Sequence, residues 1–113
     1  MGDVQTVTLY EDLLFDDLSR STFTDEDAER ILDDIDKLEE DIVTWGRPLD
    51  KCFDILSDTG NVTVYRRRKG DLRSFFVRVD NTLLCIGAGK RDTVYERDGD
   101  TIQRRAEHVA GSE

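Results

Sequence analysis

The sequence predicts an α+β fold in a single domain, residues 1–113, in which an N-terminal strand and two helices pack on an antiparallel sheet of about four strands. Three observations predict this class. The 113 residues match the length of one domain. The 37% of hydrophobic residues suffices for one two-layer core. The hydrophobic pattern changes from a helical to an alternating period in the middle of the chain.

The first part of the chain reads as one strand and two helices. Residues 4–10 alternate and are rich in β-branched side chains, which indicates a strand. Residues 11–19 carry leucines at helical spacing and predict a short helix. A longer helix begins after Thr24, where Asp27 completes a capping-box pattern. Its apolar residues recur every three or four positions and form one stripe: Ala28, Ile31, Leu32, Ile35, Leu38 and Ile42.

The second part reads as strands joined by short turns. Gly46 and Pro48 end the long helix. The predicted strands are residues 52–56, 62–66, 72–79 and 82–87. Because their connections are short and rich in turn residues, they predict an antiparallel meander. A short C-terminal helix or a tail follows from residue 93, and we expect residues 110–113 to be frayed.

Charge is distributed unevenly along the chain. The formal net charge is −10, yet residues 1–60 carry 18 acids and 5 bases, whereas residues 61–113 carry 8 acids and 11 bases. Asp outnumbers Glu 18 to 8, and Arg outnumbers Lys 12 to 4. This Asp-rich, Lys-poor composition is typical of halophilic proteins, whose like charges are screened by salt. We therefore interpret most acids as a solvated coat without chemistry.

Composition disfavours several classes of function. The only histidine is His108, which we place on the surface, and the two cysteines lack zinc-ligand spacing, so no metal or other cofactor is expected. Cys85, between two apolar residues, is predicted to pack in the core. No apolar run reaches the roughly 20 residues of a membrane span, and the acidic first 25 residues do not resemble a signal peptide. We expect a soluble, cytoplasmic protein.

Six of the basic residues fall within thirteen positions, 66–78: Arg66, Arg67, Arg68, Lys69, Arg73 and Arg78. Since side chains alternate along a strand, Arg66 and Arg68 share one face, and Tyr65 and Arg67 share the other. Guanidinium groups bind phosphate through paired hydrogen bonds and stay charged, so these residues predict a phosphodiester-binding surface. A solvated hairpin tip explains the same residues equally well.

Two segments resemble the RelE/ParE toxin superfamily of toxin–antitoxin systems. Residues 64–77, VYRRRKGDLRSFFV, are similar to its basic strand–turn–strand core, and residues 86–95, IGAGKRDTVY, resemble its final strand and following motif. The resemblance implies a RelE-like fold and a metal-free endoribonuclease. Such an mRNA interferase cleaves mRNA, usually in the ribosomal A site, by attack of the RNA 2′-hydroxyl on the adjacent phosphate.

The resemblance also implies roles for individual residues. The catalytic residues would be Arg73, which stabilises charge on the phosphate oxygens, Arg91, which acts at the leaving oxygen, and Tyr95, which stacks on a base or handles the 2′-hydroxyl proton. The implied substrate-binding residues are Arg66, Arg68, Lys69 and Lys90. The implied partners are the ribosome with its mRNA and a cognate antitoxin, whose amphipathic helix covers the basic groove.

Two departures from the family pattern keep other functions open. Val64 stands where the best-known ribosome-dependent member has a lysine, and Leu72 replaces the usual aromatic residue. One alternative is therefore a non-catalytic or ParE-like relative that acts by protein binding, either inhibiting gyrase or binding an antitoxin. A second alternative is a salt-adapted domain without a partner.

Overall fold

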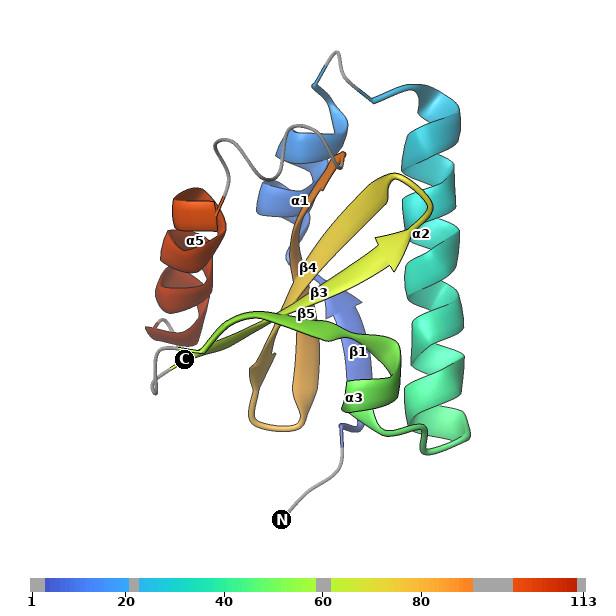
Figure 1. Ribbon diagram of the computed structural model, residues 1–113, viewed down its shortest axis with the longest axis vertical. Coiled ribbons are helices and arrows are strands. Elements are labelled where there is room, and N and C mark those ends of the chain that lie inside the picture. The colour runs from blue at the N-terminus through green and yellow to red at the C-terminus, as the bar shows by residue number, and fades with distance from the viewer. Residues whose placement is uncertain (1–3, 21–22, 59–61, 91–98, 112–113) are drawn as a thin grey trace.

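A computed structural model describes residues 4–20, 23–58, 62–90 and 99–111 and confirms the α+β class. The elements follow in the order β1 (Thr6–Leu9), α1 (Glu11–Leu18), α2 (Asp25–Glu39), the π-helical turn η1 (Glu40–Thr44), α3 (Leu49–Cys52), β2 (Asp54–Asp58), β3 (Thr63–Lys69), β4 (Leu72–Val79), β5 (Thr82–Lys90) and α5 (Gly99–Gly111) (Figure 1). None of the helices in these ranges is long and apolar enough to span a membrane.

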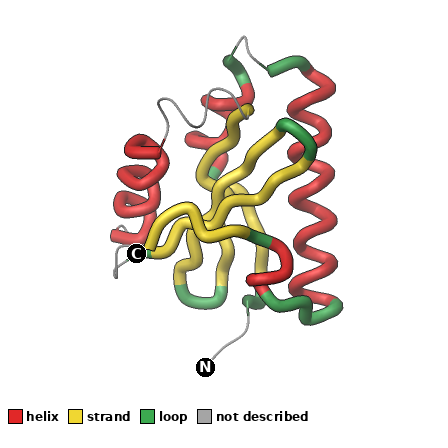
Figure 2. Tube along the Cα trace, in the orientation of Figure 1, coloured by secondary structure: helices red, strands yellow, loops and turns green. Residues whose placement is uncertain are grey.

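The five strands form one sheet in the order β1-β5-β4-β3-β2 (Figure 2). Strands β2 to β5 form the predicted antiparallel meander, and β1 pairs with β5 in parallel. The β3–β4 turn places Gly70 at a φ of 62°, a left-handed conformation that glycine adopts without steric cost. A bulge at Ile86 lets Phe75 face Gly87 while Phe76 faces Cys85. The antiparallel strands predicted from the sequence are confirmed, and the sheet has a fifth strand because β1 joins β5 in parallel.

Helices α1 and α2 supply one core of the protein. Thr24 and Asp27 form the predicted capping box, in which the Thr24 hydroxyl accepts from the Asp27 backbone N–H. The apolar stripe of α2 packs with α1 on one face of the sheet, and this core contains Leu14, Ile31, Ile35, Leu38, Phe76, Leu83 and Cys85. Cys85 is fully buried, as predicted, and burial raises the pKa of its thiol to about 12.

Helix α5 covers the other face of the sheet, so α2 and α5 lie on opposite sides (Figure 1). Its buried residues Ile102, Ala106 and Val109 pack on a second core formed by Val62, Val64, Phe75, Val77 and Ile86. His108 is exposed, as predicted. The helix continues to Gly111, further than the expected start of the frayed tail at residue 110, because Val109 is anchored in this core.

A buried carboxylate joins α5 to α1 and β5. Asp17, 2% exposed, accepts hydrogen bonds from Nη1 and Nη2 of Arg105 at 2.7 and 2.9 Å, and from the Ala88 backbone N–H at 2.9 Å. Gly87 lies beneath this pair, and a Cβ there would stand 2.8 Å from both Arg105 Nη1 and Asp17 Oδ2. Glycine at this position therefore allows α5 to approach the sheet closely.

The sequence placed several boundaries differently. Residues 49–52, after Pro48, form the single turn α3, which was not predicted, so β2 begins at Asp54 rather than at residue 52. Strand β3 continues to Lys69 and β5 to Lys90, because both pair with β4 as far as Leu72. The predicted strand 82–87 therefore ended three residues early.

Candidate functional site

Three of the predicted arginines lie on one face of the sheet. Arg66 faces Phe75 across the β3–β4 ladder, and Arg68 faces Arg73. Phe75 belongs to the core beneath α5. Side chains alternate along strands, so Arg66, Arg68 and Arg73 occupy the next positions of that same face, toward the Gly70 turn. We call these three residues the arginine cluster.

Arg67 points to the opposite face, as the alternation predicted, and is held inside the fold. Its Nε and Nη2 each donate to one carboxylate oxygen of Asp34 at 3.1 Å, and its Nη1 donates to the Cys52 carbonyl oxygen at 3.1 Å. The hydrogen bonds that Arg67 donates to Asp34 raise the pKa of the Arg67 guanidinium above its ordinary value. This arginine joins α2 to the sheet.

The two predicted lysines do not lie with the arginine cluster. Lys69 and Lys90 both flank Leu72 in the ladder, and Leu72 belongs to the core under α2. Strand alternation therefore places both lysines on the face opposite Arg66, Arg68 and Arg73. Lys90 Nζ lies 2.9 Å from Asp27 Oδ2, and this hydrogen bond lowers the pKa of Asp27.

Arg91 and Tyr95, the other two predicted catalytic residues, lie outside the described residues. Their convergence with Arg73 stays a prediction.

Arg73 has an unusual environment for a charged side chain. It is only 6% exposed, and its Nη1 donates to the carbonyl oxygens of Gly70 at 2.7 Å and Leu72 at 2.9 Å. Its Nε is buried and has no hydrogen-bond partner among the described residues. Within residues 4–20, 23–58, 62–90 and 99–111, no carboxylate lies within ion-pair distance of Arg73. A buried cation without a counter-ion is costly, so this site is suited to an anionic ligand.

The residues that face Arg73 across the sheet also favour an anionic ligand at this site. Arg68 lies directly opposite it, and two like charges in such a cross-strand pair destabilise a sheet. On its other side Arg73 faces Gly89, which carries no side chain. The strand pairing therefore concentrates positive charge at a point where no neighbouring side chain of β5 fills the space.

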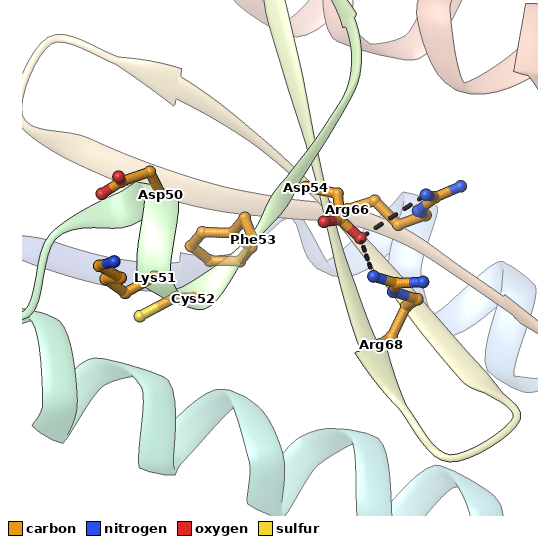
Figure 3. Close-up of a pocket in the computed structure, with 7 residues that line it drawn as sticks. All are labelled: Asp50, Lys51, Cys52, Phe53, Asp54, Arg66 and Arg68. Carbon is orange, nitrogen blue, oxygen red and sulfur yellow. Dashed lines mark ion pairs between the residues drawn. The ribbon is translucent and has the colours of Figure 1, made fainter.

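Arg66 and Arg68 share one carboxylate, Asp54 on the edge strand β2. Asp54 Oδ2 lies 2.7 Å from Arg68 Nη2 and 3.6 Å from Arg66 Nη2 (Figure 3). The three side chains line a cavity of about 230 Å³ together with Asp50, Lys51, Cys52 and Phe53. The sequence did not indicate Asp54. The chain has eighteen aspartates, and Asp54 differs from the others only in its position opposite Arg66 in the β2–β3 ladder, which the sequence does not show.

Other cavities of about 250 and 300 Å³ open elsewhere, near Arg47 and near Tyr65. Arg78 lines both of them, and none of the predicted catalytic or substrate-binding residues does. Among the described residues, no three His, Cys, Asp or Glu side chains gather as a metal site would require.

Comparison with solved structures identifies the fold. The chain is similar to a chain of the crystal structure of the archaeal RelE–RelB complex from Pyrococcus horikoshii OT3, with a TM-score of 0.51 and 24% sequence identity. The match covers 78% of this chain and 96% of that one. No protein-family model and no curated protein matches the sequence. The chain therefore has the RelE-like fold that its sequence predicted.

Proposed function

We propose that this protein is the RelE-like toxin of a toxin–antitoxin pair, a metal-free endoribonuclease that cleaves mRNA on the ribosome in the cytoplasm. The observation that carries the proposal is Arg73, a buried guanidinium whose Nε lacks a partner among the described residues and that no carboxylate of those residues neutralises. The arginine cluster around it lies on a RelE-like fold. A phosphodiester supplies the anion that Arg73 lacks among the described residues.

The chemistry assigned to the site is transesterification. The RNA 2′-oxygen attacks the adjacent phosphorus, the new 2′-O–P bond forms as the P–O5′ bond breaks, and the 2′-proton is lost while the 5′-oxygen gains one. Arg73 stabilises the charge that develops on the non-bridging oxygens. Arg91 acts at the leaving 5′-oxygen, and Tyr95 stacks on a base or handles the 2′-hydroxyl proton. The products are a 2′,3′-cyclic phosphate and a 5′-hydroxyl.

In this proposal the remaining basic residues position the substrate. Arg66 and Arg68 share the face of Arg73 and hold the phosphates next to the scissile one. Lys69 and Lys90, on the other face, contact only RNA that passes around the hairpin tip. Guanidinium groups stay protonated at physiological pH, so the arginine cluster contributes charge and orientation, and proton transfer falls to other groups.

The proposed partner is an antitoxin whose amphipathic helix lies across the arginine cluster and blocks it. The similar archaeal structure is a complex of RelE with RelB, which supports a protein partner for this chain as well. Co-purification with the product of an adjacent small reading frame tests this part of the proposal. Release of that product by Arg66→Glu with Arg68→Glu, but not by Arg30→Glu, would place it on the cluster.

The activity is tested by inducing the wild type, Arg73→Ala and Arg30→Ala in a salt-matched host. Arg30 is exposed on α2, so its substitution changes the net charge equally without touching the site. We expect cleaved messages with 5′-hydroxyl ends in the wild type and Arg30→Ala, and a loss of about 100-fold or more in Arg73→Ala. Absence of cleaved message in the wild type, or equal cleavage in all three, contradicts the proposal.

One observation favours a second function, that of a non-cleaving relative which acts by binding gyrase or an antitoxin. Asp54 already neutralises part of the charge on Arg66 and Arg68, which reduces their attraction for RNA. Plasmid supercoiling measured in the same cultures separates the two functions. Loss of supercoiling without cleaved message assigns the chain to the gyrase-directed type.

A further inference from the structure

We propose that Asp54 is an internal competitor for phosphate: its carboxylate occupies the position between Arg66 and Arg68 that a phosphate of the RNA backbone takes when substrate binds. The identity of this anion as RNA rests on the function proposed above. The competition itself rests on the geometry around Asp54.

That geometry places one carboxylate oxygen between two guanidinium groups. Asp54 pairs with Arg66 directly across the β2–β3 ladder, and its Oδ2 reaches Nη2 of both Arg66 and Arg68, at 3.6 and 2.7 Å (Figure 3). A phosphate oxygen in the same position makes the same contacts, and the phosphate offers further oxygens for paired hydrogen bonds. Carboxylate and phosphate therefore cannot both occupy this position.

Exposure shows that Asp54 is displaceable. The side chains of Asp54 and Arg68 are 41% and 54% exposed, whereas Asp34, which holds Arg67, is 3% exposed. Ion pairs open to water contribute little to stability. When a phosphate arrives, Asp54 can turn into solvent while the phosphate takes over the pairing with Arg66, whose side chain is 15% exposed. Asp34 is too deeply buried to turn away in this manner.

The cavity beside Asp54 indicates which part of the RNA enters. Its volume of about 230 Å³ lies below the roughly 300–1,000 Å³ of pockets that enclose drug-sized ligands. Phe53, on its wall, packs against Phe76 at a centroid distance of 5.1 Å and against Tyr65 at 5.7 Å. Its ring is 8% exposed and is not free to stack on a base. The cavity therefore accepts a phosphate and part of a sugar, and it reads no base.

This assignment gives Asp54 a role in selectivity. The Asp54 carboxylate already neutralises part of the charge on the two arginines, so a ligand gains binding energy from displacing it only if the ligand carries more negative charge than the carboxylate. A small anion such as chloride is therefore excluded more strongly than a polyphosphate chain. In a protein of net charge −10, the carboxylate also weakens the hold on RNA outside the ribosome.

The test measures binding of a fluorescein-labelled, uncleavable 2′-O-methyl oligoribonucleotide by fluorescence anisotropy, with the full chain. The variants are Asp54→Asn and the matched control Asp50→Asn. Asp50 lines the same cavity and changes the net charge equally, but it makes no ion pair with Arg66 or Arg68. We expect Asp54→Asn to tighten binding about 3- to 10-fold and Asp50→Asn less than about 2-fold.

Salt dependence and a second substitution sharpen the result. We expect the slope of log affinity against log salt to steepen by about 0.7 for Asp54→Asn, the value for one more neutralised phosphate on a single strand. In an Arg66→Ala, Arg68→Ala background, Asp54→Asn should give no gain. Far-ultraviolet circular dichroism checks that each variant is folded. If Asp54→Asn is not folded, Asp54→Ala takes its place.

Several outcomes overturn the proposal: weaker binding of Asp54→Asn, equal gains for both aspartate variants, or a gain that survives removal of both arginines. Competition by a polyglutamate peptide as strong as that by unlabelled oligoribonucleotide also overturns it and assigns the site to an acidic protein. Because the probe cannot be cleaved, these outcomes are independent of message cleavage, so either proposal can fail alone.

Discussion

Two arginines on neighbouring strands, Arg67 and Arg73, show how differently one residue type is used on the two faces of the sheet. Arg67 donates two hydrogen bonds to the buried carboxylate of Asp34 and a third to a backbone carbonyl. Arg73 is more deeply buried, yet among the described residues it meets only the carbonyl oxygens of Gly70 and Leu72. Arg67 and Arg73 are the same residue type and belong to the same basic run. What distinguishes the arginine that holds the fold from the one suited to a ligand is the presence of a carboxylate counter-ion.

The same distinction extends to the helices. Arg67–Asp34 joins α2 to one face of the sheet, and Arg105–Asp17 joins α5 to α1 near the other face. Both pairs are bidentate and link residues far apart in the sequence. Neither Arg68 nor Arg73 makes such a connection to a helix among the described residues. Their guanidiniums are therefore the ones whose substitution should change function more than stability.

The largest effect on stability is expected from Asp34→Ala. The substitution leaves the Arg67 guanidinium half-buried without its carboxylate, and breaking a buried pair in this way lowers the free energy of unfolding by about 3–5 kcal/mol. Urea unfolding in salt-matched buffer measures the loss. Asp33→Ala, an exposed neighbour on α2, is the control and should change stability by less than about 0.5 kcal/mol. A similar small change for both would show that Arg67 does not hold the fold.

Gly87→Ala should have the next largest effect. The added Cβ would lie 2.8 Å from Asp17 Oδ2 and Arg105 Nη1 and 2.9 Å from Ile102 Cδ1. Because the carboxylate and guanidinium are fixed by each other, they cannot move away freely, and overpacking of this kind costs about 1–3 kcal/mol. Urea unfolding measures it. Gly111→Ala, with open space around its Cβ, is the control, and an equal effect at both positions would contradict the close packing of α5.

Arg73→Met should change stability least among the buried charges. Methionine fills similar space, removes a charge that no described carboxylate neutralises, and forfeits two hydrogen bonds to carbonyl oxygens, so the free energy of unfolding should stay within about 1 kcal/mol of the wild type. The same unfolding experiment with Arg67→Met provides the contrast. A loss at Arg73 as large as that at Arg67 would make Arg73 a structural residue.

Titration of the Cys85 thiol has the smallest effect on stability at neutral pH, and this effect grows as the solution becomes alkaline. Burial raises its thiol pKa to about 12 from an ordinary 9.0, so the folded state keeps a proton that the unfolded state releases. Its stabilisation is complete below pH 9 and is lost as pH rises from 9 to 12, by up to about 1.4 kcal/mol per pH unit. Guanidiniums keep their charge there, so the Arg67–Asp34 pair does not contribute to the decline.

Unfolding curves at pH 8, 9, 10 and 11 test this dependence. Cys85→Ala lowers stability at every pH by removing core volume, but it should flatten the decline between pH 9 and 11. An unchanged slope in that variant would show that another group titrates.

The sequence predicted the elements whose signals are local. The cap at Thr24, the stripe of α2 and the strand 72–79 follow from spacing alone, and alternation correctly put Arg66 and Arg67 on opposite faces. The four-residue helix α3 is too short to carry a periodic signal. The extension of β5 to Lys90 was hidden by its glycines, and at Gly87 it is the approach of α5, a tertiary contact, that leaves no room for a side chain.

The site was only partly predictable for a similar reason. Local alternation groups Arg66 with Arg68, but register across two strands decides that Arg73 joins them while Lys69 and Lys90 do not. The counter-ions Asp34 and Asp54 come from other elements, and in a chain with eighteen aspartates nothing local marks them. Burial and ion pairing, which separate the arginines that hold the fold from those of the proposed site, appear only in the folded chain.

The most direct measurement records the guanidinium Nε–H signals of Arg67 and Arg73 by nitrogen-15 NMR during titration with the 2′-O-methyl oligoribonucleotide. We predict a saturable shift of the Arg73 signal while the Arg67 signal stays in place, because the Arg73 Nε has no hydrogen-bond partner among the described residues whereas the Arg67 Nε already donates to Asp34. A stationary Arg73 signal at saturating RNA, or a shift confined to Arg67, would contradict the assignment of the arginine cluster as a phosphodiester site.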